Sequence, residues 1–262
     1  MRAKKSLGQH FLRDTEVLQR IADAARLSPA DTVLEVGPGD GALTALLLER
    51  AGTVVAVEKD ARLMPLLREK FAREIASQKL ILAEQDILAF SPSAYNLTPS
   101  AYKIVANLPY YITGQFLRKF LQSKAQPNMM VLLLQKEVAR RIVGGPASPK
   151  LRRASKESIL SMSVRCYGTP RYLGTVGASS FSPPPKVDSA ILAIEHISKE
   201  FFSGLSEEKF FSILKRGFAH PRKLLASNLG IQKEALVRCG IAANARAENV
   251  TLEQWKCIAC AL

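Results

Sequence analysis

Short apolar runs alternate with segments of helical periodicity over the first two-thirds of the chain. The apolar runs that predict strands cover residues 31–36, 53–58, 79–84, 102–106 and 128–135. Helical spacing of apolar residues begins after Asp14, an expected N-cap, and covers 14–27, 42–50, 60–75 and 114–122. An uninterrupted apolar run such as 129–134 suits a sheet covered on both faces, and alternation with helices implies right-handed crossovers. The pattern therefore predicts a doubly wound, mostly parallel α/β sheet.

The pattern changes in the last third of the chain. We expect a loop over 144–150 and a helix over 156–166. Three consecutive prolines make 181–186 a stiff extended segment, and strand character returns over 187–197. Beyond it every signal is helical, with candidate helices at 206–218, 222–229, 233–240 and 252–262. We therefore predict two domains, an α/β domain over 1–197 and a small all-helical domain over 198–262.

The charge balance favours a polyanionic partner. The chain of 262 residues carries 37 Lys and Arg against 23 Asp and Glu, a formal net charge of +14. Nucleic acid gains affinity from such an excess because neutralised phosphates release counterions. No apolar run approaches the roughly 18–20 residues of a membrane span, and no apolar signal core follows the basic N-terminus. We therefore expect a cytoplasmic protein that binds nucleic acid and no membrane.

The cysteines suggest neither a disulfide framework nor a metal site. Four cysteines are too few for a disulfide scaffold at this length. Cys257 and Cys260 have the spacing of a redox motif or of half a zinc site, but they have no second pair and fall on the predicted last helix. We expect free thiols at all positions and no metal, and the sequence assigns no function to the Cys257–Cys260 pair.

A glycine loop follows the first predicted strand. Gly37 and Gly39 open the next helix, so that backbone can approach a ligand closely. Together with Ala42 they also satisfy the dinucleotide fingerprint, and Glu58 ends the second strand where an acidic residue binds ribose hydroxyls. This pattern indicates an adenosine cofactor and leaves NAD and S-adenosyl-L-methionine both open.

The end of the fourth strand distinguishes between the two cofactors. Asn107-Leu108-Pro109-Tyr110 lies at the carboxyl edge, where open α/β sheets bind ligands. The lone pair of an adenine N6 amine is delocalised into the ring, and the Asn107 side-chain oxygen and the Pro109 carbonyl can both accept from that amine. Tyr110 offers a face for the base to stack on. Because a hydride-transfer enzyme has no use for this group, the motif favours methyl transfer to an aromatic amine.

With these motifs in place, the chain resembles the KsgA family of small-subunit ribosomal RNA adenine dimethyltransferases, relatives of the erythromycin-resistance rRNA methylases. The resemblance spans nearly the whole length and rests on the segments 5–12, 35–39, 56–60, 85–87, 107–110, 134–138, 181–189, 217–223 and 228–229. It implies a Rossmann-like methyltransferase sheet with a helical C-terminal rRNA-binding domain. It also implies transfer of two methyl groups from S-adenosyl-L-methionine to each of two adjacent adenosines near the 3′ end of 16S rRNA, with a role in ribosome biogenesis.

The resemblance also assigns roles to individual residues. The implied catalytic residues are Asn107, Leu108, Pro109, Tyr110 and Phe181, with Phe181 stacking on the target adenine opposite Tyr110. The implied cofactor residues are Gln9, His10, Leu12, Gly37, Gly39, Glu58, Lys59, Asp86, Ile87 and Asn107. Two positions depart from the family pattern, because His10 and Tyr111 stand where Asn is frequent. Neither departure removes a residue that the chemistry requires.

Basic residues gather after the active-site strand and suggest a track for the rRNA backbone. They are Arg140, Arg141, Arg152, Arg153, Lys215, Arg216, Arg222 and Lys223, each of which alone is an ordinary surface charge. We expect the partner to be 16S rRNA within an immature small ribosomal subunit, bound by a monomer.

Three other functions compete with this interpretation. An NAD(P)-dependent oxidoreductase shares the glycine loop and Glu58 but leaves residues 107–110 and the charge unexplained. A noncatalytic ribosome-assembly factor retains the fold, although every expected catalytic position is intact here. Methylation of large-subunit rRNA, as in the resistance enzymes, differs mainly in the C-terminal domain.

Overall fold

The chain separates into two compact units. The computed structural model describes residue 4 and residues 8–144 and 157–262. One unit comprises Met1–Ala139 with Thr169–Ser198, and the other comprises Arg140–Gly168 with Lys199–Leu262. The predicted domain boundary at residues 197–198 lies next to the point, after Ser198, where the chain passes from the first unit to the second. The predicted domains and these units differ over the described residues 140–144 and 157–168, which we expected in the first domain and which here group with the C-terminal helices.

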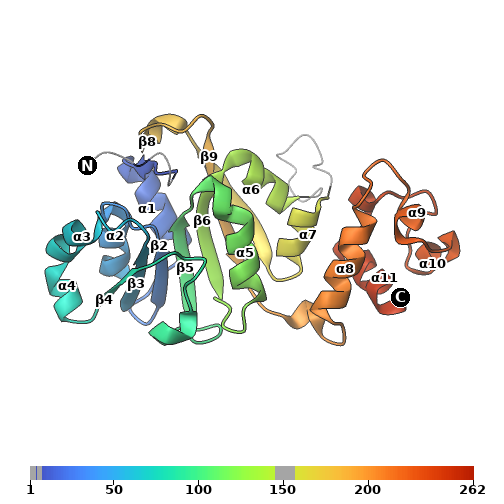
Figure 1. The fold of residues 1–262 in the computed structure, drawn as a ribbon, viewed down its shortest axis with the longest axis horizontal. Helices are drawn as coiled ribbons and strands as arrows, with labels where there is room; N and C mark the ends of the chain where they lie inside the picture. Colours follow the sequence, from blue (N-terminus) through green and yellow to red (C-terminus); the bar gives the residue numbers. More distant parts are fainter. Residues whose placement is uncertain (1–3, 5–7, 145–156) are drawn as a thin grey trace. The chain divides into compact units, whose positions relative to one another are not determined.

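The first unit is built on a seven-stranded sheet in the order β4-β3-β2-β5-β6-β9-β7 (Figure 1). The five strands from β4 to β6 pair in parallel, and β9 is antiparallel to both of its neighbours. The strands are β2 Thr32–Val36, β3 Thr53–Glu58, β4 Leu80–Glu84, β5 Tyr102–Asn107, β6 Met129–Gln135, β7 Thr169–Val176 and β9 Ser189–Glu195. The predicted doubly wound, mostly parallel sheet is confirmed.

Helices follow the parallel strands as expected. They are α1 Thr15–Ala24, α2 Ala42–Arg50, α3 Met64–Lys70, α4 Ala72–Ala76, α5 Thr113–Gln122 and α6 Lys136–Val143, with short 3₁₀ helices η2 Pro92–Tyr95, η3 Tyr110–Ile112 and η4 Ala178–Ser180. Asp14 caps α1 by accepting from the backbone N–H groups of Glu16 and Val17. The single helix predicted over 60–75 is two helices, interrupted at Phe71, whose φ of −115° is not helical.

One face of the sheet is covered by α1, α2 and α3. Their buried apolar residues form a single core with alternate residues of the strands, including Val33, Val54, Val105, Val131 and Ile191. Since side chains alternate along a strand, Glu35 lies on this same covered face as Val33. The core therefore contains a carboxyl group that is only 1% exposed.

Strand β7 and helix α6 are the longest of the elements that were not predicted. Strand β7 forms an edge of the sheet, and its residues alternate between exposed and half-buried up to Val176. It contains Pro170 and Gly174, which are turn signals in sequence, and its register shifts between Tyr172 and Gly174. Helix α6 follows β6 directly at Lys136, so no turn residue marks where the strand ends and the helix begins. The loop expected over 144–150 lies, except for Gly144, outside the described residues.

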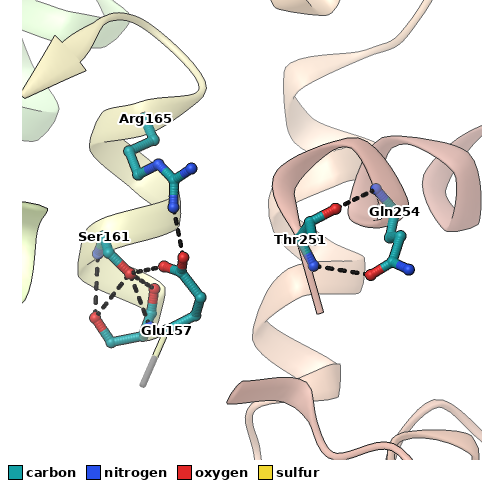
Figure 2. Close-up of polar contacts among 6 residues, drawn as sticks. Glu157, Ser161, Arg165, Thr251 and Gln254 are labelled. Carbon is teal, nitrogen blue, oxygen red and sulfur yellow. Dashed lines mark hydrogen bonds and ion pairs between the residues drawn. The ribbon is translucent and has the colours of Figure 1, made fainter. Parts of the chain in front are cut away.

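The second unit is helical in its described part. Its helices are α7 Ile159–Arg165, α8 Glu207–Gly217, α9 Leu225–Leu229, α10 Lys233–Arg238 and α11 Leu252–Ala261, with η5 Glu200–Phe202 and η6 Ala247–Asn249. Figure 2 shows a capping box at the start of α11, where Thr251 and Gln254 exchange side-chain to backbone hydrogen bonds. A second box, formed by Ser158 and Ser161, begins α7. The predicted all-helical C-terminal region is confirmed.

The prediction that all four cysteines are free thiols is wrong for two of them. Cys239 and Cys257 form a disulfide, with Cα atoms 5.7 Å apart. Cys239 directly follows α10, and α11, which contains Cys257, packs beside α10. A sequence separation of 18 gives no sign of that contact. Cys166 and Cys260 are free. Within the described residues, no helix combines the length and apolar character needed to cross a bilayer.

Candidate active site

A cavity of about 370 Å³ opens in the first unit at the carboxyl ends of β2, β3, β4 and β5. Strand β2 pairs with β3 on one edge and with β5 on the other. The strand order therefore reverses its direction at β2, which makes it the switch point of the sheet. Open α/β sheets bind ligands at such a switch point. The volume falls within the roughly 300–1,000 Å³ of small-molecule sites.

The glycine loop forms the floor of this cavity. Gly37 and Gly39 have φ values of +71° and +62°, which a residue with a side chain rarely adopts. A Cβ atom on Gly37 would lie 3.7 Å from the backbone oxygen of Asn107 and would fill the space between β2 and β5. Both glycines line the cavity. The loop therefore leaves room for a ligand that backbone alone contacts.

Glu58 ends β3 as a buried acceptor in the cavity wall. One carboxylate oxygen accepts from Gly39 N–H at 3.2 Å and the other from Asp60 N–H at 2.8 Å. Burial raises the pKa of Glu58 above its ordinary value. Each oxygen retains a second lone pair, so that Glu58 can still accept from hydroxyl groups of a ligand.

Asp60 ties the N-terminal segment to the end of β3. Its carboxylate accepts from the Arg62 guanidinium at 2.6 and 2.9 Å and from Gln9 Nε2 at 2.8 Å. The Arg62 side chain, followed by Gln9, holds the pKa of Asp60 far below its usual range. Gln9, predicted as a cofactor residue, lines the cavity and also anchors residues 8–12 over it.

Asp86 presents an ionised carboxylate beyond the end of β4. One oxygen accepts from Leu88 N–H at 2.8 Å, and the other pairs with Lys59 Nζ at 2.7 Å. The Lys59 ammonium lowers the pKa of Asp86, and Asp86 in turn raises the pKa of Lys59. The carboxylate therefore caps a turn and also lines the cavity, next to Ile87.

Asn107 has its side-chain amide oriented by a backbone group. Asn107 Nδ2 donates to the His10 carbonyl oxygen at 3.2 Å, which leaves Oδ1 as the acceptor of the amide. Leu108 N–H donates to Leu133 O at 3.1 Å, so the pairing of β5 with β6 continues past Asn107. The amide is thus fixed on a central strand at the edge of the cavity.

His10 connects Asn107 to the segment that contains Phe181. Strand β1 (Phe11–Leu12) pairs with β8 (Phe181–Ser182), and His10 Nδ1 lies 2.7 Å from the Pro183 carbonyl oxygen. Since a carbonyl only accepts, Nδ1 carries the proton. The His10 ring is nearly parallel to the Tyr110 ring, with an interplanar angle of 23° and centroids 6.3 Å apart.

The structure brings most of the predicted site residues together. The predicted residues that line the cavity are Gln9, His10, Gly37, Gly39, Glu58, Lys59, Asp86, Ile87, Asn107, Leu108, Pro109, Tyr110 and Phe181. Leu12 is not among them, because it lies in the core opposite Phe181 and is 6% exposed. Tyr111 lines the cavity with 63% of its surface exposed. The sequence analysis did not name Phe11, Leu88, Ile112 or Gln115, which also line the cavity. The first three are apolar, so their chemistry gave no sign of a site.

The predicted basic track is described only in part. Arg141, Lys215, Arg216, Arg222 and Lys223 are exposed residues of the second unit. Arg140 belongs to the same unit and is half-buried. Arg216 also donates to the Leu229 carbonyl at 2.5 Å, so it supports the end of α9. Arg152 and Arg153 lie outside the described residues. The described residues contain no cluster of His, Cys, Asp or Glu suited to a metal ion.

The chain is similar to known proteins over its whole length. The sequence model of the family "Ribosomal RNA adenine dimethylase" matches residues 1–262. The chain is 44% identical to ribosomal RNA small subunit methyltransferase A of Dehalococcoides mccartyi strain CBDB1, covering 98% of this chain and 87% of the relative. It is 39% identical to the protein of the same name from Thermosynechococcus vestitus, covering 97% and 95%.

Solved structures show the same fold. The 23S rRNA methyltransferase ErmE is 27% identical, with a TM-score of 0.75 over 95% of this chain and 98% of its own. A dimethyladenosine transferase from Plasmodium falciparum is 23% identical, with a TM-score of 0.77 over 95% and 96%. From its full-length match to the family model and to relatives such as these, we conclude that the chain belongs to the ribosomal RNA adenine dimethylases, enzymes that dimethylate N6 of adenine in ribosomal RNA.

Proposed function

We propose that this enzyme transfers methyl groups from S-adenosyl-L-methionine to the N6 amines of two adjacent adenosines near the 3′ end of 16S rRNA, during small-subunit biogenesis. The proposal follows the names of its relatives, which are small-subunit methyltransferases. The observation that carries it is the fixed amide of Asn107, whose Nδ2 is held by His10 O at 3.2 Å.

The orientation of this amide suits an aromatic amine. With Nδ2 engaged, Oδ1 accepts one N6–H of the target adenine, and the Pro109 carbonyl accepts the other. Two acceptors that hold both hydrogens on the side of the amine away from the methyl donor favour a more tetrahedral nitrogen, so that its lone pair leaves conjugation with the ring and points toward that donor. Because the acceptors are already in place, they need no reorganisation during the reaction. No strong base takes part, and most of the rate enhancement comes from holding the amine in position against the methyl donor.

The residues of the cavity fit the proposed cofactor. Gly37 leaves open the space that its Cβ would fill, which admits the amino-acid end. Glu58 and Asp86 are acceptors, for the ribose hydroxyls and for the adenine amine respectively, and Ile87 packs on the adenine ring. When bound, the cofactor supplies an electrophilic methyl group on a sulfonium, and the neighbouring carboxylates favour that positive charge.

The target base is held between two aromatic rings in this proposal. Tyr110 and Phe181 line the same cavity but come from η3 and β8, which are far apart in sequence. Aromatic faces on both sides compensate a base for the stacking that it loses when it leaves the RNA. The exposed cations of the second unit, Arg141, Lys215, Arg222 and Lys223 among them, contact the rRNA backbone.

The remaining parts of the proposal concern its setting. We propose that the enzyme acts in the cytoplasm as a monomer, without a metal ion, on rRNA within an immature small subunit. Mass spectrometry of the 16S rRNA 3′ end tests the target directly. Two neighbouring dimethyladenosines should be present with the protein and absent without it. Dimethyladenosine in 23S rRNA instead would favour the activity named for ErmE, to which the chain is 27% identical.

A further inference from the structure

The hydroxyl of Tyr110 is held by a residue far away in the sequence. Its oxygen lies 2.8 Å from the hydroxyl oxygen of Ser189, 79 residues later in the chain. Ser189 is fully buried, and it pairs with Gln135 of β6 and with Val176 of β7. A side chain on a strand paired on both sides has little freedom to move. Tyr110, by contrast, lies in the short helix η3 at the cavity.

The segment that ends at Ser189 begins at Phe181. At its start, Phe181 is paired with Leu12 and is 5% exposed. At its end, Lys136 N–H donates to the Asp188 carbonyl at 3.0 Å, and Lys136 Nζ pairs with the Asp188 carboxylate at 3.0 Å. Three consecutive prolines stiffen the stretch between these two anchors. One segment, fixed at both ends, therefore supplies Phe181 and also the partner of Tyr110.

We propose that Ser189 is a positioning residue that sets the gap between the Tyr110 and Phe181 rings to the thickness of one nucleobase. The proposal rests on the proposed function, in which these rings hold the target adenine. The Tyr110 oxygen lies on the axis about which the ring turns, so the hydrogen bond fixes the direction of that axis and prevents a change of χ1. A ring that swings to another rotamer would fill the gap or leave one face of the base without contact.

The hydrogen bond acts through position and not through proton transfer. Burial raises the pKa of Tyr110, the hydrogen bond to Ser189 partly opposes that rise, and the nearby Asp188 carboxylate adds to it. The phenol therefore stays protonated throughout the neutral range and does not serve as a base. Loss of the Ser189 hydroxyl should then lower the rate equally at every pH in that range.

A double-mutant cycle tests this role. The variants are Ser189→Ala, Tyr110→Phe and the two together, assayed with immature small ribosomal subunits for kcat, for KM of each substrate and for the pH profile. Each single variant should lower kcat about tenfold, with KM for S-adenosylmethionine and the pH profile unchanged. The double variant should be no slower than the slower single variant, because all three lack the same bond.

The control separates positioning from stability. Ser161 is the other fully buried serine of the described residues, and it forms the capping box of α7 with the N-cap residue Ser158 in the second unit. Ser161→Ala should lower the unfolding temperature and leave kcat unchanged. Additive losses in the cycle, or a Ser189→Ala variant that loses stability but retains kcat, would overturn the proposal. If the wild-type enzyme itself methylates no adenine, the proposed function fails instead, which is a distinguishable result.

Discussion

Glu35 is a carboxyl group buried in the apolar core of the first unit. It lies on β2 and is 1% exposed. Burial raises its pKa from 4.5 to about 8, with the negative charge of Glu58 contributing in the same direction. At a pH between these two values, Glu35 is therefore protonated in the folded protein and ionised in the unfolded chain.

The stability of the enzyme should fall as the pH rises because of Glu35. Below pH 4.5 the residue is protonated in both states and contributes no pH dependence. From there to about pH 8, the free energy of unfolding declines by about 1.4 kcal/mol per pH unit on account of this group. Glu35→Gln should remove that decline, which chemical denaturation of both proteins at pH 6 and pH 8 measures. If the free energy of unfolding changed by the same amount between pH 6 and pH 8 in both proteins, the prediction for Glu35 would be wrong.

Asp86 is ionised, and its charge should matter for cofactor affinity. Its pKa is lowered by Lys59, so the carboxylate accepts as an anion at neutral pH. Asp86→Asn keeps the shape but makes the acceptor neutral, and binding of S-adenosylhomocysteine should weaken about tenfold. Isothermal titration calorimetry gives the dissociation constant. Asp23→Asn is the matched control, since Asp23 pairs with Arg50 on the surface and should leave the affinity unchanged.

At the scale of elements, the sequence predicted whatever depends on local pattern. Strand β3 and helix α2 begin and end where their apolar spacing indicates. The cavity residues at the ends of β2 to β5 were also predictable, because parallel strands place their carboxyl ends at one edge. The role of Ser189 was hidden, because a serine at the start of an apolar strand carries no signal of its partner 79 residues away.

The elements missed by sequence analysis owe their positions to long-range contacts. Strand β7 is stabilised by pairing with β9 and contains a proline and a glycine that read as a loop. The Cys239–Cys257 disulfide depends on the packing of helices, and the position of Leu12 beside Phe181 depends on the pairing of β1 with β8. None of these contacts follows from spacing along the chain.

Helices α8 and α11 approach each other closely at Gly217. A Cβ atom there would lie 2.3 Å from Trp255 Cη2, and Trp255 is fully buried. Gly217→Ala should therefore destabilise the second unit by about 1–3 kcal/mol through overpacking. Gly114 in α5 has no atom within 4 Å of its would-be Cβ, so Gly114→Ala should leave stability unchanged or raise it slightly. Thermal unfolding of both variants tests this, and equal effects would contradict the close packing.

At the scale of the whole molecule, the net charge of +14 should appear in the salt dependence of RNA binding. Lys215, Arg222 and Lys223 are exposed in the second unit. Replacing all three by Ala should weaken binding and reduce the slope of log K against log salt by up to about 2–3. Filter binding over a salt series measures that slope. Lys124→Ala is the control, since Lys124 is an exposed lysine beyond the carboxyl end of α5. If Lys124→Ala reduced the slope of log K against log salt as much as the triple variant, the cations would bind RNA without a defined track.

The central claim is that a fixed Asn107 amide directs the adenine amine toward the methyl donor. Single-turnover methyl transfer by Asn107→Ala, measured with immature small subunits and saturating S-adenosylmethionine, tests it most directly. The account predicts a loss of about hundredfold or more in the rate of transfer, with S-adenosylhomocysteine still bound. Dimethyladenosine formed by Asn107→Ala at the wild-type rate would contradict it.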